Sequence, residues 1–207
     1  MGAQERKDVL AERAATYELL AGLFLQEATA GFLERLRDDA AFADGPLGDY
    51  AASLSGVDAE QARIEAAADY AALFLGMSAQ PVPPYESVYT SELQLLMQEA
   101  RDKAVEAYRA NGFTAAVDFG LPEDHAGVEL QFMARLCRAE LAALDAGDEA
   151  EAGQLADAQA AFLREHLLSW MPQLCDDVEK RAETGLYRGL ARMTRQFLEF
   201  EREELAE

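Results

Sequence analysis

The sequence is short of basic residues. Its 207 residues include 18 lysines and arginines against 39 aspartates and glutamates, which gives a formal net charge of −21. Such a chain repels the phosphate backbone of nucleic acids, so we expect no nucleic-acid partner. The same charge can keep the protein soluble, or it can attract a basic partner and speed its encounter. Composition alone leaves both interpretations open.

Long apolar runs and cysteines are also scarce. No apolar run approaches the roughly 20 residues that cross a bilayer, and the first ten residues, MGAQERKDVL, lack the apolar core of a signal peptide. We therefore expect no membrane span and a cytoplasmic location. Cys137 and Cys175 are too few for a disulfide framework. Both follow apolar patterns typical of small core residues.

The usual signatures of catalysis are missing as well. The sequence has no glycine-rich phosphate loop, no HExxH and no CxxC, and no serine or cysteine is spaced from a base as an activated nucleophile would be. His125 and Glu129 are one helical turn apart and could share a metal ion, but two histidines in the whole chain are a poor ligand supply. The sequence thus predicts neither metal nor cofactor, and it favours a binding protein over an enzyme.

Helical periodicity dominates what is present, and no run of alternating strand residues occurs. The predicted helices cover residues 8–27, 31–39, 59–75, 91 to about 110, 122–146, 148–169, 173–183 and 186–204. We predict an all-α fold, a compact multi-helix bundle that forms a single domain over residues 1–207. An irregular connection at 110–122 is the place where we expect a hinge.

Local signals set several of these boundaries. Gly76 is expected to stop one helix, Pro122 to lie in the first turn of another, and Pro172 to interrupt a third. Ser91 with Gln94 has the spacing of a capping box. The helix that would follow places its apolar side chains on one buried stripe: Leu93, Leu96, Met97, Ala100 and Ala104.

A proline-rich loop, GMSAQPVPPYESVYTSE at 76–92, stands out among the helices. Pro83 and Pro84 fix φ and remove two backbone donors, which holds Tyr85 in a nearly extended chain. Ser87 and Tyr89 follow with hydroxyls at alternate positions. The loop either fills a gap between two helices with aromatic rings, or it presents a recognition surface at a low entropic cost.

The second unusual segment is LPEDHAGVELQF at 121–132. Glu123 and Asp124 fall in a predicted first turn, where the helix dipole favours acids. This is ordinary helix-start chemistry, in a partly exposed position. Alternatively, an acid pair beside His125 could receive guanidinium groups through charge-assisted hydrogen bonds.

Several segments together resemble the TorD/DmsD/NarJ family, the cytoplasmic chaperones of molybdenum-containing respiratory oxidoreductases, also called redox enzyme maturation proteins. The resemblance covers nearly the whole chain in the family's order. The segments that carry it are YAALFLG at 70–76, PPYESVY at 83–89, LPEDHAGVELQFMARL at 121–136, FLREHLLSWMPQL, and TGLYRGLARMTRQFL.

This resemblance implies an all-helical, non-enzymatic protein that occurs as a monomer or a domain-swapped dimer. Its partner would be the catalytic subunit of a molybdenum oxidoreductase before cofactor insertion, together with the N-terminal twin-arginine signal peptide of an exported client. The alternative is a permanent assembly partner of an oxidoreductase complex that reads no signal peptide.

The resemblance also suggests which residues bind the peptide. Asp124 and His125 match the family's Asp-His pair at the proposed peptide-binding surface, Glu129 lies one turn beyond, and Glu123 adds negative charge. The remaining signature positions are Tyr70, Phe74, Gly76, Pro84, Tyr85, Ser87 and Tyr89. We expect the proline-rich loop and the acid-led helix to form two walls of one groove, which would take a basic head and an apolar helical stretch.

Overall fold

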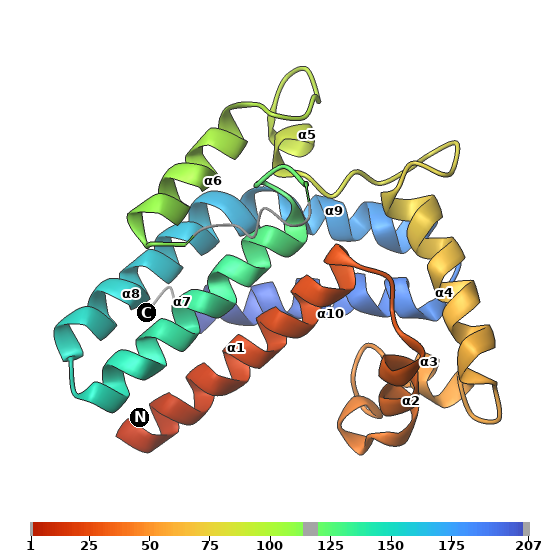
Figure 1. Ribbon diagram of the computed structural model, residues 1–207, viewed down its shortest axis with the longest axis horizontal. Helices are drawn as coiled ribbons and strands as arrows, with labels where there is room; N and C mark the ends of the chain where they lie inside the picture. Colours follow the sequence, from red (N-terminus) through yellow and green to blue (C-terminus); the bar gives the residue numbers. More distant parts are fainter. Residues whose placement is uncertain (1, 114–119, 205–207) are drawn as a thin grey trace. The chain divides into compact units, whose positions relative to one another are not determined.

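The protein is described by a computed structural model that covers residues 2–113 and 120–204 (Figure 1). Within these ranges every regular element is a helix and none is a strand, which confirms the predicted all-α fold. The elements are α1 (Ala3–Leu25), α2 (Ala30–Asp38), a 3₁₀ turn (Ala40–Phe42), α3 (Gly48–Ser53), α4 (Ala59–Phe74), α5 (Glu86–Thr90), α6 (Glu99–Ala110), α7 (Ala126–Ala146), α8 (Glu149–Phe162), a π-helical segment (Leu163–Leu167), α9 (Leu168–Arg181) and α10 (Gly185–Glu204).

The chain forms two compact units. The first comprises Met1–Leu25, Tyr85–Trp170 and Glu201–Glu207, and the second comprises Gln26–Pro84 and Met171–Phe200. The expected single domain stays a prediction, and so does the hinge near 110–122, where residues 114–119 lie outside the described ranges. Among the described residues, no helix combines the length and the apolar character that crossing a membrane requires.

The first unit is built on α1 and α7, which lie side by side, and on α8, which folds back along α7 (Figure 1). A Cβ at Gly127 would stand 2.4 Å from Leu25 Cγ and 2.9 Å from the Ala21 carbonyl oxygen, so only glycine permits this close approach. Arg13 and Glu201 form a buried ion pair in this unit. The guanidinium group donates two hydrogen bonds of 2.6 Å to the carboxylate.

In the second unit, α4 begins and ends where its local sequence predicts. Asp58 caps its first turn by accepting from the backbone N–H groups of Glu60 and Gln61. Gly76, at φ +73°, follows the end of the helix in the left-handed conformation that stops a helix. Asp69 lies further along α4 and accepts hydrogen bonds from the backbone N–H groups of Glu183 and Thr184, just before α10.

The predicted helix from Ser91 is wrong over its first eight residues. Ser91 ends α5 instead of starting a new helix, because its backbone N–H bonds to the Ser87 carbonyl. Gln94 and Met97 have φ values of +52° and +61°, in the left-handed region, and α6 begins only at Glu99. Leu93, Leu96 and Met97 of the expected core stripe therefore lie on an irregular segment and are exposed. Ala104, in α6, is buried as predicted.

Two proline signals are also corrected. Pro122 does not lie in a first turn, because α7 begins at Ala126 with His125 as its cap. Pro172 does not interrupt a helix, since α9 runs through it from Leu168 to Arg181. The irregularity falls one turn earlier, in the π-helical segment, where a wider turn replaces the regular bonding pattern.

Candidate functional site

The two unusual segments of the sequence meet in the first unit. The backbone N–H of Glu86 donates to the Asp124 carbonyl oxygen, and the N–H of Ser87 donates to Asp124 Oδ2, both at 2.9 Å. Tyr85 and His125 form an isolated β-bridge, and their rings stand edge to face with centroids 5.1 Å apart. Tyr85, the residue at the N-terminus of α5, makes no side-chain cap hydrogen bond. Asp124, from a distant part of the chain, therefore caps this helix.

The expected partial exposure of this acid–histidine pair is wrong. Asp124 is 0% exposed and His125 is 3% exposed. The physical reason is that both side chains cap helices: Asp124 serves α5, and His125 Nδ1 accepts a 3.0 Å hydrogen bond from the backbone N–H of Gly127 in α7. Burial lowers the pKa of His125 to about 4, so the imidazole is neutral at neutral pH. Burial also raises the pKa of Asp124, while hydrogen bonds from Ser87 oppose that rise.

The two segments are not opposite walls of an open groove, because they bond directly to each other. A hollow of about 730 Å³ lies instead between α5, the start of α6 and the segment Glu165–Ser169. Among the described residues its lining is acidic: it contains Glu92, Glu99 and Glu165 and one lysine, Lys103, which already pairs with Glu99 at 2.8 Å. An acidic hollow of this kind suits a basic ligand group.

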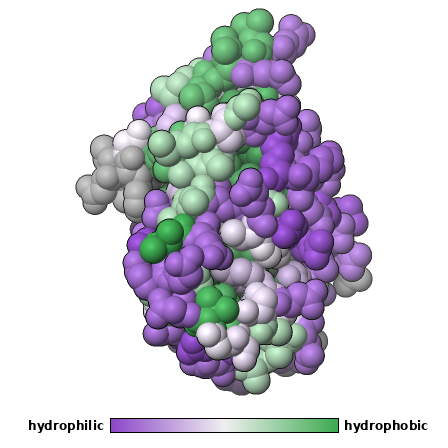
Figure 2. Space-filling view, turned by 90° about the vertical axis from the view of Figure 1, so that its right-hand side faces the viewer, coloured by the Kyte–Doolittle hydropathy of each residue, from purple (hydrophilic) through white to green (hydrophobic). Residues whose placement is uncertain are grey.

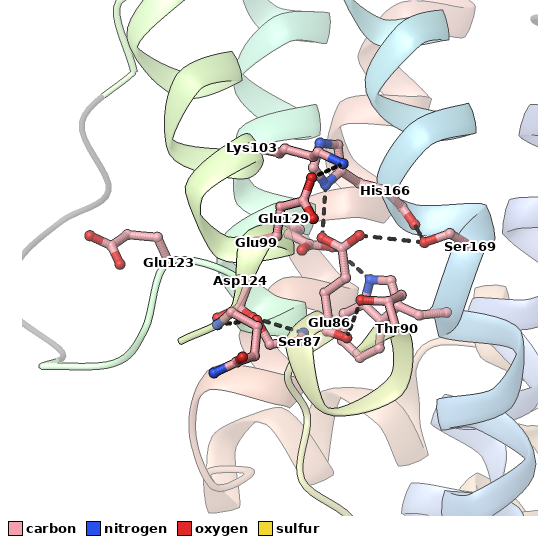
Figure 3. A network of polar contacts seen from close by, with 12 residues as sticks. Glu86, Ser87, Thr90, Glu99, Lys103, Glu123, Asp124, Glu129, His166 and Ser169 are labelled. Carbon is pink, nitrogen blue, oxygen red and sulfur yellow. Dashed lines mark hydrogen bonds and ion pairs between the residues drawn. The ribbon is translucent and has the colours of Figure 1, made fainter. Parts of the chain in front are cut away.

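Beneath the hollow lies a buried cluster of two carboxylates and an imidazole (Figure 3). Glu86 from α5 and His166 from the π-helical segment are joined by a 2.8 Å hydrogen bond between Oε2 and Nδ1. Glu129 from α7 accepts a 3.0 Å hydrogen bond from Trp170 Nε1 through its Oε2. Burial, followed by the nearby charge of Glu86, raises the pKa of Glu129 well above its usual range.

An apolar patch adjoins the hollow. The loop between α5 and α6 exposes four large apolar side chains, with Leu93 at 71%, and the others are Leu95, Leu96 and Met97. Figure 2 shows this patch as green atoms at the top of the molecule, the height at which Figure 1 draws the loop. Ser87 fixes the far end of the loop, since its Oγ accepts a 3.1 Å hydrogen bond from the Gln98 backbone N–H.

The other predicted site residues divide between the two units. Glu123 points away from the buried cluster (Figure 3) and forms a two-bond ion pair with Arg101, at 2.7 and 2.8 Å. Tyr89 packs its ring against Trp170, with centroids 5.4 Å apart. Four predicted residues belong to the second unit: Tyr70, Phe74, Gly76 and Pro84. Of these, Tyr70 and Phe74 are buried and pack against the ring of Tyr187.

Sequence reasoning missed His166 and Trp170. Both lie in the segment FLREHLLSWMPQL, which contributed to the family resemblance but supplied no predicted site residue. Their spacing of four residues is the available signal, because it places both on one face of a helix. The exposed loop was missed for a different reason, since its apolar pattern is the same as that of a buried helix face.

Comparisons with known proteins show what the chain is similar to in sequence. The sequence model of a family described as nitrate reductase delta subunit matches residues 25–176. The chain is similar to a protein of Vibrio cholerae named chaperone protein TorD, with 32% identity over 145 residues, which is 69% of this chain and 63% of that protein. The chain therefore spans less than two thirds of that relative's length.

Two longer matches carry the same name, chaperone protein TorD. One is from a Psychrobacter species, 29% identical over 208 residues that cover 93% of this chain and 91% of the relative. The other is from a Shewanella species, 27% identical over 215 residues that cover 96% of each. The similarity thus extends through nearly the whole chain, and through the segments that form the hollow.

Proposed function

Since the chain belongs to the family described as nitrate reductase delta subunit, we propose that it is a maturation chaperone of a molybdenum-containing respiratory oxidoreductase. In this role it binds the catalytic subunit before the enzyme receives its cofactor, in the cytoplasm, and it carries out no catalysis itself. The relatives named chaperone protein TorD support this role. They also confirm the resemblance to the TorD/DmsD/NarJ chaperones that the sequence motifs indicated.

The observation that carries the proposal is the acidic hollow next to an exposed apolar loop. A twin-arginine leader has the complementary order, a basic head followed by an apolar stretch. We propose that the guanidinium groups enter the hollow, where Glu92, Glu99 and Glu165 supply negative charge. The apolar stretch then packs on Leu93 and its neighbours in the loop, as an amphipathic helix does in a receptor groove.

The buried motif residues have a positioning role in this scheme. Asp124 holds the start of α5 through Ser87, and Ser87 in turn holds Gln98 at the end of the apolar loop. A substitution of Asp124 or His125 would then act on the peptide through the position of α5 and the loop. Tyr85, Tyr89, Glu123 and Glu129, all in the first unit, remain in the proposed peptide set. A role for Tyr70, Phe74, Gly76 and Pro84, in the second unit, stays a prediction from the sequence.

Calorimetric titration with a synthetic twin-arginine leader peptide tests the proposal. Replacing Leu93 and Leu95 by serine removes apolar contacts worth about 1 kcal/mol each, so the affinity should fall about thirty-fold. The matched control replaces Val57 and Ile64, two exposed apolar residues of the second unit, by serine. A leader with both arginines changed to glutamine should also bind more weakly.

Equal affinities for both double variants, or for both peptides, would contradict the proposed binding mode. The wider role has a separate test, in which the chain is co-expressed with the catalytic subunit and the complex is purified. A chaperone should leave the enzyme once its cofactor is loaded, whereas a permanent assembly partner should remain on the mature enzyme.

A further inference from the structure

We propose that Glu86, Glu129 and His166 form a binding site for a divalent transition-metal ion, with Zn²⁺ as the representative case. Each side chain offers one ligand atom, and the three atoms lie within 4.8 Å of one another. Bonds from Zn²⁺ to carboxylate oxygen and imidazole nitrogen are about 2.0 to 2.2 Å, which places tetrahedral ligands about 3.4 Å apart. Small side-chain movements therefore bring all three atoms onto one ion.

A second observation, the environment of Glu129, supports a cation at this position. Glu129 is 0% exposed, and no N–H group of the described residues donates to its Oε1; the group beside it is a second carboxyl, that of Glu86. A buried carboxylate oxygen without a partner is costly, and the cost falls when a cation coordinates it. Two carboxylates packed together in the interior add to this cost, because they repel each other when both are ionised.

Neighbouring side chains fix the orientation of the proposed ligands, as outer-shell groups do around known metal sites. Trp170 fixes Glu129 by donating to Oε2, which leaves Oε1 as the carboxylate oxygen that can bind an ion. The ring of Phe162 stacks on the imidazole of His166, with centroids 4.4 Å apart. Each ligand also comes from a different element, and all three belong to the first unit, so the helices are already placed for the ion.

The ligand chemistry selects the type of ion. Carboxylates alone would suit Mg²⁺ or Ca²⁺, but an imidazole nitrogen favours Zn²⁺ and its first-row neighbours. Glu86 and His166 also line the hollow, which gives the ion a path from solvent. Three protein ligands leave a fourth position for water on that side.

The test is calorimetric titration of the chelator-treated protein with ZnCl₂. We expect one ion to bind per chain. Glu129→Gln keeps an acceptor for Trp170 but removes a ligand charge, and it should weaken binding at least about tenfold; His166→Gln should do the same. Two matched controls at exposed acids outside the hollow, Glu106→Gln and Glu203→Gln, should bind as wild type does.

The absence of stoichiometric binding by the wild-type protein would overturn the proposal. So would equal affinities for the ligand variants and the controls, provided that circular dichroism shows all of them folded. X-ray absorption of the zinc-loaded wild-type protein gives an answer that does not depend on any variant. We expect oxygen and imidazole ligands, and a sulfur ligand would move the ion to Cys137 or Cys175 and refute the site. Neither measurement involves a peptide, so a negative result leaves the proposed chaperone function standing.

Discussion

The buried histidine at the start of α7 makes the stability of the protein depend on pH. His125 is 3% exposed, and its pKa falls from 6.5 to about 4 on folding. The unfolded chain therefore takes up a proton in this range more readily than the folded chain. Stability is full above about pH 6.5 and is lost as the pH falls towards 4.

The structure also gives the size of this loss of stability and its local cause. The fall in the His125 pKa from 6.5 to about 4 contributes about 3.4 kcal/mol to the free energy of unfolding. About 2 kcal/mol of this contribution is lost between about pH 7 and pH 5. Protonation at Nδ1 also removes the acceptor for the Gly127 N–H, so the first turn of α7 loses its cap. The acid-sensitive element is thus the start of α7.

The variant His125→Asn isolates this contribution. Asparagine is a favoured N-cap, and its side-chain oxygen can accept from the Gly127 N–H without titrating. Urea unfolding followed by circular dichroism at the two pH values gives the free energy of unfolding for both proteins. Because every other titrating group is shared, the wild type should lose about 2 kcal/mol more than the variant. Losses that agree within about 0.5 kcal/mol would refute the reasoning.

Two further predictions concern stability and the proline-rich loop. Glu201→Gln leaves the buried Arg13 charge uncompensated and should lower the free energy of unfolding by about 3 kcal/mol, whereas Glu203→Gln, at an exposed position, should change it little; similar urea midpoints for both would contradict this. Replacing Pro83 and Pro84 together by glycine restores backbone freedom and should weaken leader-peptide binding more than it lowers the melting temperature; a large fall in melting temperature with unchanged affinity would instead assign these prolines to packing.

The comparison of sequence and structure separates two kinds of prediction. The core face of α1 was predicted correctly, because Leu10, Tyr17 and Phe24 repeat with the period of a single helix. The stop at Gly76 was also correct, since a helix C-terminus depends on the few residues around it. The same reasoning failed for Leu93 and its neighbours. Their pattern fits a buried helix face, but Ser91 ends α5 and the residues that follow form an exposed loop.

The sequence by itself therefore determined the all-α fold, most of the helices and the family, because periodicity, caps and motifs are properties of neighbouring residues. Only the tertiary structure decided that Asp124 is buried as the cap of α5, and that Glu86, Glu129 and His166 share one pocket. Glu86, Glu129 and His166 are far apart in the chain and come from different helical elements. Whether they come into contact depends on how the helices pack. A helical pattern indicates which face of a helix is buried, but it does not indicate which residue of another helix packs against that face.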